Sequence, residues 1–262
     1  MDIVFLKQKK IKDNQSKQLN TDVSMKKAII IGATSGIGRE LALLFSSQNF
    51  EIGLIGRRTK LLEELSELIE TKTYPLALDI NNTNQSIPSL EKLIQTMGGV
   101  DVIIITAGTG YLNNNLDWKY EHKTIETNVK GFTAMTNVSM RQFIKQGYGH
   151  LVGISSIASI RGSDTAPAYN ASKAYISNYL EGLRIKVLKS KLPIYITDIQ
   201  PGLINTAMAK GEKLFWVEPV PKVAKQIYNA IKRKKRKVYI TKRWMLIALL
   251  LKILPEFIYK KI

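Results

Sequence analysis

A short apolar run, Ala28–Ile31, leads directly into the glycine-rich turn Gly32-Ala33-Thr34-Ser35-Gly36-Ile37-Gly38, and no other feature constrains the fold as strongly. Glycines let the backbone turn sharply and let a phosphate approach the next helix, whose N-terminal N–H groups and dipole favour anions. The spacing is G-x-x-x-G-x-G, which differs from the G-x-G-x-x-G of other dinucleotide sites. Because the turn joins a first strand to a helix, it predicts a dinucleotide-binding α/β fold.

The rest of the chain alternates short apolar runs with segments of 3.6-residue period. The expected strands are Ala28–Ile31, Ile52–Ile55, Tyr74–Leu78, Val100–Thr106, His150–Ser155, Ile194–Ile199 and Val238–Thr241. The expected helices are Gly38–Ser47, Lys60–Glu70, Ser89–Met97, Thr124–Gln146, Ala168–Lys189 and Pro221–Lys232. Continuous apolar runs suit strands that are covered on both faces of a parallel sheet. The alternation predicts a Rossmann-like, doubly wound sheet of about seven parallel strands with helices on both faces.

Composition divides the chain into three parts. We expect one Rossmann-fold catalytic domain over residues 25–241, because no low-complexity linker interrupts it. Residues 1–24 are rich in Lys and Asn, and their apolar run is too short for a signal peptide, which predicts a disordered extension. Residues 242–262 predict an amphipathic C-terminal tail.

The second expected strand ends in Gly56-Arg57-Arg58. A site that takes NAD usually has an acidic residue about 20 positions beyond the turn, to bind the ribose 2′-hydroxyl. Two guanidinium groups suit a 2′-phosphate instead, because they stay charged and bind phosphate through paired N–H groups. We therefore expect NADP(H) as the cofactor. The alternative is that both arginines belong to a solvated helix start in a chain rich in basic residues.

Tyr169 and Lys173 stand four residues apart at the start of an expected helix and therefore share one of its faces. A phenol has an ordinary pKa of about 10, and a nearby ammonium group lowers it. Tyr169 is then a candidate general acid for reduction or general base for oxidation. Ser156 follows the fifth strand, at the carboxyl edge where α/β sheets bind ligands, and its hydroxyl can hold a substrate oxygen.

With these residues in their order, the chain resembles the short-chain dehydrogenase/reductase family from about Lys26 to about Thr241. The matching positions are Gly32, Gly36, Ile37, Gly38, Asp79, Ala107, Gly108, Asn128, Ser155, Ser156, Tyr169, Lys173, Pro201, Gly202 and Thr206. Ser156 stands thirteen positions before Tyr169, as in that family. The resemblance implies an NADP(H)-dependent oxidoreductase that acts on a ketone or a secondary alcohol.

The resemblance also implies a role for each matching residue. The catalytic residues would be Asn128, Ser156, Tyr169 and Lys173. Tyr169 would exchange the proton, Lys173 would bind the nicotinamide ribose, and Asn128 would hold a water in the proton relay. The cofactor-binding residues would be Gly32, Thr34, Ser35, Gly36, Ile37, Gly38, Arg57, Arg58, Asp79, Ile80, Ala107, Gly108, Tyr169, Lys173, Pro201, Gly202, Ile204 and Thr206. A flexible lid would follow, around Ala207–Val217.

Two positions depart from the family pattern. The family's Asn-Asn-Ala-Gly stretch reads Ile105-Thr106-Ala107-Gly108, and Ile31 replaces the Thr before the first glycine. These positions support the sheet and the cofactor loop, so we expect a modest loss of local hydrogen bonding there. Every member of the Ser–Tyr–Lys–Asn set is present, which favours an active enzyme.

The net charge of +18 is concentrated near the C-terminus, where residues 222–262 contain 13 of the 39 basic residues and one acid, Glu256. Lys232–Lys237 is an unbroken basic run. Trp244–Leu251 is apolar but shorter than the roughly 20 residues that span a bilayer. A basic cluster beside a Trp-led apolar helix suits peripheral contact with an anionic membrane. A reductase attached in this way would be expected to act on a lipophilic ketone or alcohol. The alternatives are a helix packed on the domain or on a dimer partner.

Other classes of function receive less support. The chain has no cysteine, and its two histidines lie far apart, so we expect no metal site. It shows neither a helix-turn-helix pattern nor an RNA-stacking aromatic motif, so nucleic acid is not an expected partner. By resemblance, we expect a homodimer or homotetramer in the cytoplasm, at the inner face of the membrane if the tail docks there. The competing hypothesis is a non-catalytic NADP(H)-binding regulator or scaffold at a membrane surface.

Overall fold

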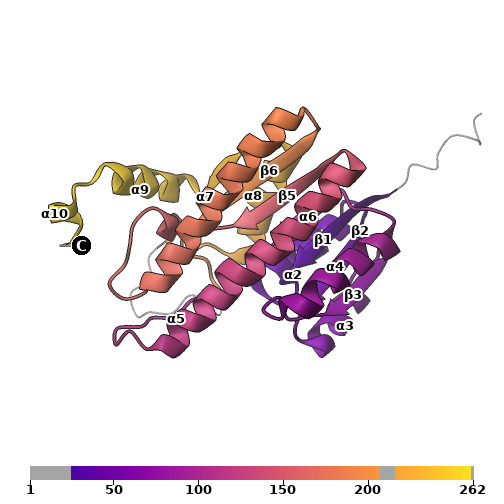
Figure 1. Ribbon diagram of the computed structural model, residues 1–262, viewed down its shortest axis with the longest axis horizontal. Helices are drawn as coiled ribbons and strands as arrows, with labels where there is room; N and C mark the ends of the chain where they lie inside the picture. The colour runs from indigo at the N-terminus through magenta and orange to yellow at the C-terminus, as the bar shows by residue number, and fades with distance from the viewer. Residues whose placement is uncertain (1–24, 207–215, 261–262) are drawn as a thin grey trace, which may run out of the picture.

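The computed structural model describes residues 25–206 and 216–260, and in them seven parallel strands form one sheet in the order β3-β2-β1-β4-β5-β6-β7 (Figure 1). The strands are β1 (Lys26–Ile31), β2 (Phe50–Gly56), β3 (Thr73–Ala77), β4 (Val102–Ile105), β5 (Gly149–Ile154), β6 (Ile194–Pro201) and β7 (Lys237–Ile240). This order confirms the predicted Rossmann-like fold. The chain reverses its direction of travel across the sheet between β3 and β4, where such folds bind ligands.

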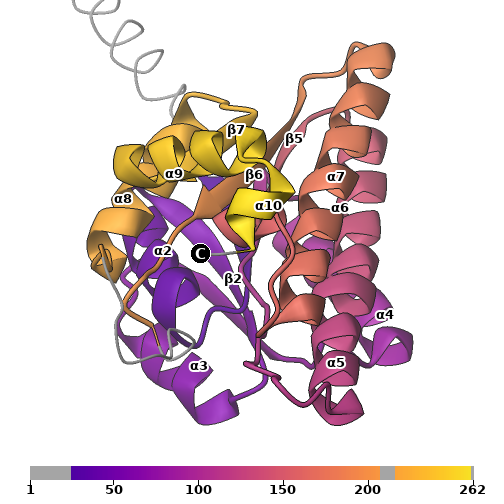
Figure 2. The same cartoon turned by 90° about the vertical axis from the view of Figure 1, so that its left-hand side faces the viewer.

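Helices cover both faces of the sheet (Figure 2). They are α2 (Gly36–Ser46), α3 (Thr59–Glu67), α4 (Thr83–Met97), α5 (Trp118–Ile125), α6 (Phe132–Gln146), α7 (Pro167–Ser190), α8 (Val220–Lys232), α9 (Lys242–Ile253) and α10 (Glu256–Tyr259), with the short helices η1 (Glu126–Gly131) and η2 (Ile157–Ser159). Helices α2, α3 and α8 pack on one face, and α4, α6 and α7 pack on the other. Side chains of β1 alternate between these two cores, with Ala28 and Ile30 in the first and Ile29 and Ile31 in the second.

Two helices differ from the sequence prediction. Helix α4 starts at Thr83, six residues before the expected Ser89, because a first turn closed by the bond from Ser86 N to Asn82 O (2.8 Å) forms ahead of Pro88. The helix expected over Thr124–Gln146 begins earlier, at Trp118, and is interrupted by the π-helical η1. Single π-helical turns are often found at functional sites.

Parts of the expected organisation fall outside the described residues. The N-terminal extension, residues 1–24, and most of the expected lid, residues 207–215, belong to this group. Among the described helices, none combines the length and the apolar character that crossing a bilayer requires.

Candidate functional site

The turn between β1 and α2 is built so tightly that only glycine fits two of its positions. Gly32 has a φ of +102°, and a Cβ there would lie 2.6 Å from both Ala107 N and Thr106 Oγ1. A Cβ on Gly38 would overlap the carbonyl oxygen of Gly32. Ser35, the N-cap residue of α2, makes no capping bond with its side chain, and the first turn of α2 contains no acidic residue. The N-terminal N–H groups of α2 therefore suit a phosphate, as a dinucleotide cradle requires.

Arg58 reaches back from the start of α3 to this turn. Its Nη2 donates to Thr34 Oγ1 (2.7 Å) and to Ser35 Oγ (3.0 Å), and its Nε donates to Thr34 Oγ1 (3.2 Å). The guanidinium is exposed and lies directly on the glycine-rich turn. Arg57 is also exposed. Arg58 is thus placed to bind an anion next to the turn. If it belonged only to a solvated helix start, its side chain would not need to reach the turn.

The end of β4 closes the other side of the turn. Thr106 Oγ1 donates to Ile31 O (3.0 Å) and Gly32 O (3.1 Å), and Ala107 N donates to Ile31 O (2.8 Å). The expected loss of hydrogen bonding at this departure from the family pattern is therefore wrong at Thr106. Its single O–H lies within hydrogen-bond distance of both carbonyl oxygens, one in β1 and one in the turn.

The remaining predicted cofactor residues lie around this edge at different depths. Thr206 lies over the turn, since a Cβ on Gly36 would be 3.3 Å from Thr206 Cγ2. Ile204 is buried and forms an isolated parallel bridge with Glu218. Asp79 is exposed, and its carboxylate accepts from Asn81 N (3.0 Å). Ile80 is buried against Gly131, and Pro201 ends β6 with Gly202 next to it.

Ser156, Tyr169 and Lys173 meet at the carboxyl edge between β5 and α7. Ser156 Oγ donates to Pro201 O (3.4 Å), and the same hydroxyl lies close enough to the Tyr169 phenol to favour its ionised form. Lys173 Nζ lies 5.6 Å from the centroid of the Tyr169 ring and donates to Ile154 O (3.0 Å). Ser156 and Lys173 are both buried. The sequence placed these side chains at one edge, and the structure brings all three into one cluster.

Burial shifts the pKa of both titratable members of this cluster. Desolvation raises the pKa of Tyr169, and the Ser156 hydroxyl acts in the opposite direction. Desolvation also lowers the pKa of Lys173 to about 8, against the attraction of Asp198. The sequence led us to expect a lowered pKa for Tyr169, and for the protein alone that expectation is wrong. Removing the phenol from water opposes its ionisation more than its polar neighbours favour it.

Asn128 lies in the π-helical η1 and is fully buried. Its Oδ1 accepts from Thr109 N (2.8 Å), and its Nδ2 donates to Thr109 O (2.7 Å) and Ser172 Oγ (2.9 Å). A Cβ on Gly108 would lie 3.3 Å from Asn128 Oδ1 and 3.4 Å from Lys173 Nζ. Asn128 therefore ties the loop after β4 to α7, immediately beside the Lys173 ammonium group.

Two residues that matter for this geometry were missed in the sequence. Gly110 supports the Tyr169 ring, since a Cβ there would lie 2.5 Å from Tyr169 Cδ2. Asp198 is fully buried and accepts from Ser155 Oγ, from Ser177 Oγ (2.7 Å) and from Gln200 Nε2 (2.8 Å). The polar residues Thr197, Asp198 and Gln200 in an otherwise apolar strand were the available signal for this network.

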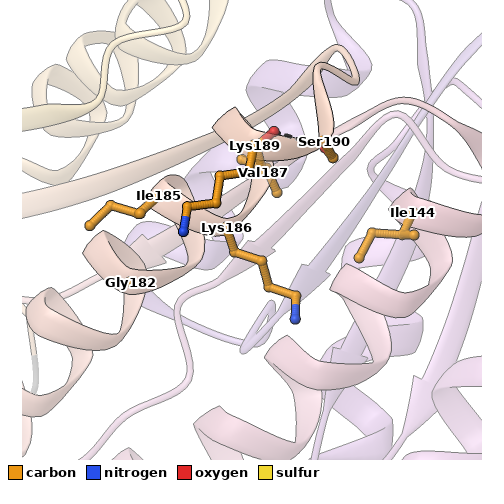
Figure 3. A pocket seen from close by; sticks show the side chains of 7 residues that line it. All are labelled: Ile144, Gly182, Ile185, Lys186, Val187, Lys189 and Ser190. Atoms are coloured by element: carbon orange, nitrogen blue, oxygen red, sulfur yellow. Dashed lines mark hydrogen bonds between the residues drawn. The ribbon is translucent and has the colours of Figure 1, made fainter.

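A shallow groove between the outer surfaces of α6 and α7 lies apart from this cluster (Figure 3). Ile144 of α6 faces it from one side, and residues of α7, among them Ile185 and Lys186, line the other side. None of the candidate catalytic or cofactor residues lines it. It belongs to the outer surface of the helix pair, away from the carboxyl edge of the sheet.

Comparison with known proteins identifies the family. The sequence pattern described as short chain dehydrogenase matches residues 26–214, so the chain belongs to the short-chain dehydrogenase/reductase family, as predicted. An uncharacterized oxidoreductase of Myxococcus xanthus is 31% identical over 192 residues, which cover 71% of this chain and 75% of that protein. Dehydrogenase/reductase SDR family member 7B of Danio rerio is 30% identical over 242 residues, covering 83% and 77%.

Solved structures agree with the fold. The alcohol dehydrogenase of the archaeon Thermococcus sibiricus, complexed with 5-hydroxy-NADP, superposes with a TM-score of 0.73 at 20% identity, covering 83% of this chain and 96% of that one. The protein ElxO with NADP bound superposes with a TM-score of 0.72 at 20% identity, covering 82% and 97%. At this level of identity the likeness concerns the fold alone. The chain therefore belongs to a family of oxidoreductases.

Proposed function

We propose that the protein is an NADP(H)-dependent oxidoreductase that transfers a hydride between the nicotinamide and a ketone or secondary alcohol. The observation that carries the proposal is the cluster of Ser156, Tyr169 and Lys173 at the carboxyl edge, beside the glycine cradle. The catalytic domain comprises residues 25–241, and residues 242–262 form a tail. When bound, the cofactor supplies or accepts the hydride.

The protein's own residues manage the substrate oxygen and its proton. The raised pKa of Tyr169 keeps its phenol protonated at neutral pH, which suits a proton donor in reduction. Ser156 Oγ, close to the same phenol, is placed to hold the carbonyl oxygen beside it. Lys173, with a pKa of about 8, is mostly charged at pH 7 and stabilises the phenolate left after donation. Asn128 fixes the adjacent loop and α7 through its amide.

Arg58 supports the preference for NADP(H), because its guanidinium lies on the phosphate-binding turn. The neighbouring structures described as complexes with 5-hydroxy-NADP and NADP favour the same cofactor. Titration with NADPH and NADH, followed by nicotinamide fluorescence, tests this part. We expect tighter binding of NADPH and a loss of that preference in Arg58→Asp. Arg57→Asp should weaken the same preference, since both guanidinium groups are expected to bind the 2′-phosphate. Equal binding of both nucleotides by the unmodified protein would contradict the proposal.

Assembly is part of the same proposal. We place a homodimer or homotetramer contact on the outer surface of α6 and α7, where Ile144, Ile185 and Leu188 are exposed. Sedimentation velocity tests this contact, with Leu188→Glu expected to shift the protein toward monomers. We also propose that the protein lies in the cytoplasm, with its tail against the inner face of an anionic membrane.

The alternative function, an NADP(H)-binding regulator or scaffold without turnover, draws its support from the tail alone. The two hypotheses differ in whether the chemistry of Tyr169 matters, and substitution of this residue separates them.

A further inference from the structure

One side of the C-terminal helix α9 is fixed to the catalytic edge of the sheet. Trp244 is 3% exposed, and a Cβ on Gly202 would overlap its ring. Ala248, one turn further along α9, is fully buried. Gly202 follows Pro201, whose carbonyl oxygen accepts from Ser156 Oγ (3.4 Å). The tail therefore starts directly behind the catalytic cluster.

Beyond α9 the tail also contacts the loop that joins Ser156 to Tyr169. Arg161 Nη2 donates to Leu254 O (2.6 Å), and the Tyr259 hydroxyl donates to Gly162 O (2.5 Å). The Arg161 guanidinium lies 4.9 Å from the centroid of the Tyr259 ring. The tail is thus held against two walls of the substrate side, the end of β6 and the 157–166 loop.

The opposite side of the tail is apolar and bare. We call its exposed residues the tail face: Met245, Leu246, Leu249, Leu250, Ile253, Phe257 and Ile258. Figure 1 shows α9 and α10 extending beyond the sheet on the side of the catalytic edge. All eight residues of Trp244–Leu251 are apolar, so α9 has apolar side chains on every side along this stretch. Such a helix normally lies in a protein core or in lipid.

Basic residues border this apolar surface. Arg243, Lys252 and Lys260 are exposed along α9 and α10, and Glu256 is the single acidic residue among them. An apolar surface with a cationic border complements an anionic bilayer, where the apolar side chains enter the acyl boundary and the cations meet the headgroups.

We propose that the tail face docks on an anionic bilayer, so that a lipophilic ketone or alcohol reaches Tyr169 directly from the lipid, along the tail. Of this inference, only the delivery of substrate to Tyr169 rests on the proposed function. Docking follows from the tail face and its border, and delivery follows from the contacts of the tail with Gly202, Arg161 and Gly162. The tail is then both an anchor and a wall of the route to the site.

Vesicle sedimentation tests docking without any use of activity. The full chain is mixed with vesicles of phosphatidylcholine alone or with 30 mol% phosphatidylglycerol, at low and high salt. We expect binding to the anionic vesicles only, weakened by salt. The double variant Leu249→Glu/Ile253→Glu should lose binding at least tenfold, because both side chains belong to the tail face. Leu68→Glu, on a similarly exposed leucine directly after α3, is the matched control and should bind as the unmodified protein does.

Three results would overturn docking. In the first, the double variant binds anionic vesicles as well as the unmodified protein does. In the second, the unmodified protein binds neutral vesicles as well as anionic ones. In the third, neither protein binds vesicles, and the double variant forms a smaller assembly than the unmodified protein. The last result would assign the tail face to a second copy of the chain. Circular dichroism melting of each variant checks that the fold is intact.

Delivery is tested with two ketones, one short and water-soluble and one long-chain and embedded in the anionic vesicles. The double variant should reduce the embedded ketone about tenfold more slowly and the soluble ketone at an unchanged rate. Equal rates on the embedded ketone overturn delivery from the lipid. Reduction of neither ketone by the unmodified protein, with vesicle binding intact, counts against the proposed function and the delivery route, while docking stands.

Discussion

The two ends of the parallel sheet both bury polar side chains, but they use them differently. At the carboxyl edge, Ser156, Tyr169 and Lys173 converge on one place from β5 and α7. Toward the amino edge, His150 Nε2 and Thr197 Oγ1 bond each other (2.8 Å), and Thr197 bonds Lys235 O. The His150–Thr197 pair forms its hydrogen bonds within itself and with the turn before β7. Buried polarity alone therefore does not mark a candidate site, whereas convergence of polar side chains beside the glycine-rich turn does.

The comparison predicts that changes at the carboxyl edge alter rate, whereas changes near the amino edge alter stability. Tyr169→Phe should lower kcat by about 10²- to 10⁴-fold, because it removes the proton donor and little else. Nicotinamide fluorescence should show unchanged NADPH binding. An unchanged rate would sink the enzyme hypothesis and favour the non-catalytic regulator.

A substitution in the tail tests whether α9 is a fixed part of the carboxyl edge of the sheet. Trp244→Ala should lower the free energy of unfolding by about 3 to 5 kcal/mol, as expected for a large buried aromatic side chain. Trp118→Ala is the control, because Trp118 is mostly exposed. Urea unfolding measures both. A cost below about 1 kcal/mol for Trp244→Ala would mean that α9 is not a fixed part of this edge.

His150 should make stability depend on pH without affecting catalysis. Its burial, with a smaller contribution from Lys234, lowers its pKa from 6.5 to about 4. Below pH 6.5 the unfolded chain takes up a proton that the folded chain does not, so the contribution is complete above pH 6.5 and is lost toward pH 4. We expect a loss of about 2 to 3 kcal/mol between pH 7 and pH 4.5 that is absent in His150→Gln.

Urea unfolding at several pH values measures this difference between the two proteins. Parallel pH profiles for the unmodified protein and His150→Gln would contradict the assignment. A change in kcat at pH 7 in His150→Gln would show that the amino end of the sheet also affects catalysis.

Substitution of Asp198, which lies in the hydrogen-bond network next to Lys173, has the smallest expected effect on activity. Its charge raises the pKa of Lys173 against desolvation, so Asp198→Asn should lower that pKa further. Lys173 then loses its charge at a lower pH, and reductase activity at pH 8 should fall roughly three- to tenfold while activity at pH 6 changes little. Ser177→Ala removes a hydrogen-bond donor without removing charge. An identical pH profile for Asp198→Asn would assign it a purely structural role.

Much of the site could be predicted because its signals are local. The turn from Gly32 to Gly38 and the Tyr169–Lys173 pair each lie within a few residues, and each strand reveals itself by its own apolar run. The interruption of the long helix at η1 could not be predicted in this way. It depends on the bonds of Asn128 to Thr109 and Ser172, and the latter is 44 residues away. Periodicity within one segment contains no information about such partners.

The tail gives the clearest division between sequence and tertiary structure. By sequence, Lys232–Lys237 stands only a few residues before α9, and we expected the two to form one basic and apolar surface. In the structure, Lys234 Nζ lies 3.1 Å from Tyr195 OH, near the amino end of β6, whereas α9 starts beyond the carboxyl end of β7. The four residues of β7 carry the chain about 13 Å across the sheet.

The sequence by itself determined the fold class, the family, the glycine cradle and the identity of the candidate catalytic side chains, because each depends on short-range pattern. Only the tertiary structure decided which side of α9 is buried, that Asp198 influences Lys173, and that the phenol of Tyr169 is desolvated. These properties depend on which groups exclude water from one another, and those groups come from segments far apart in the chain.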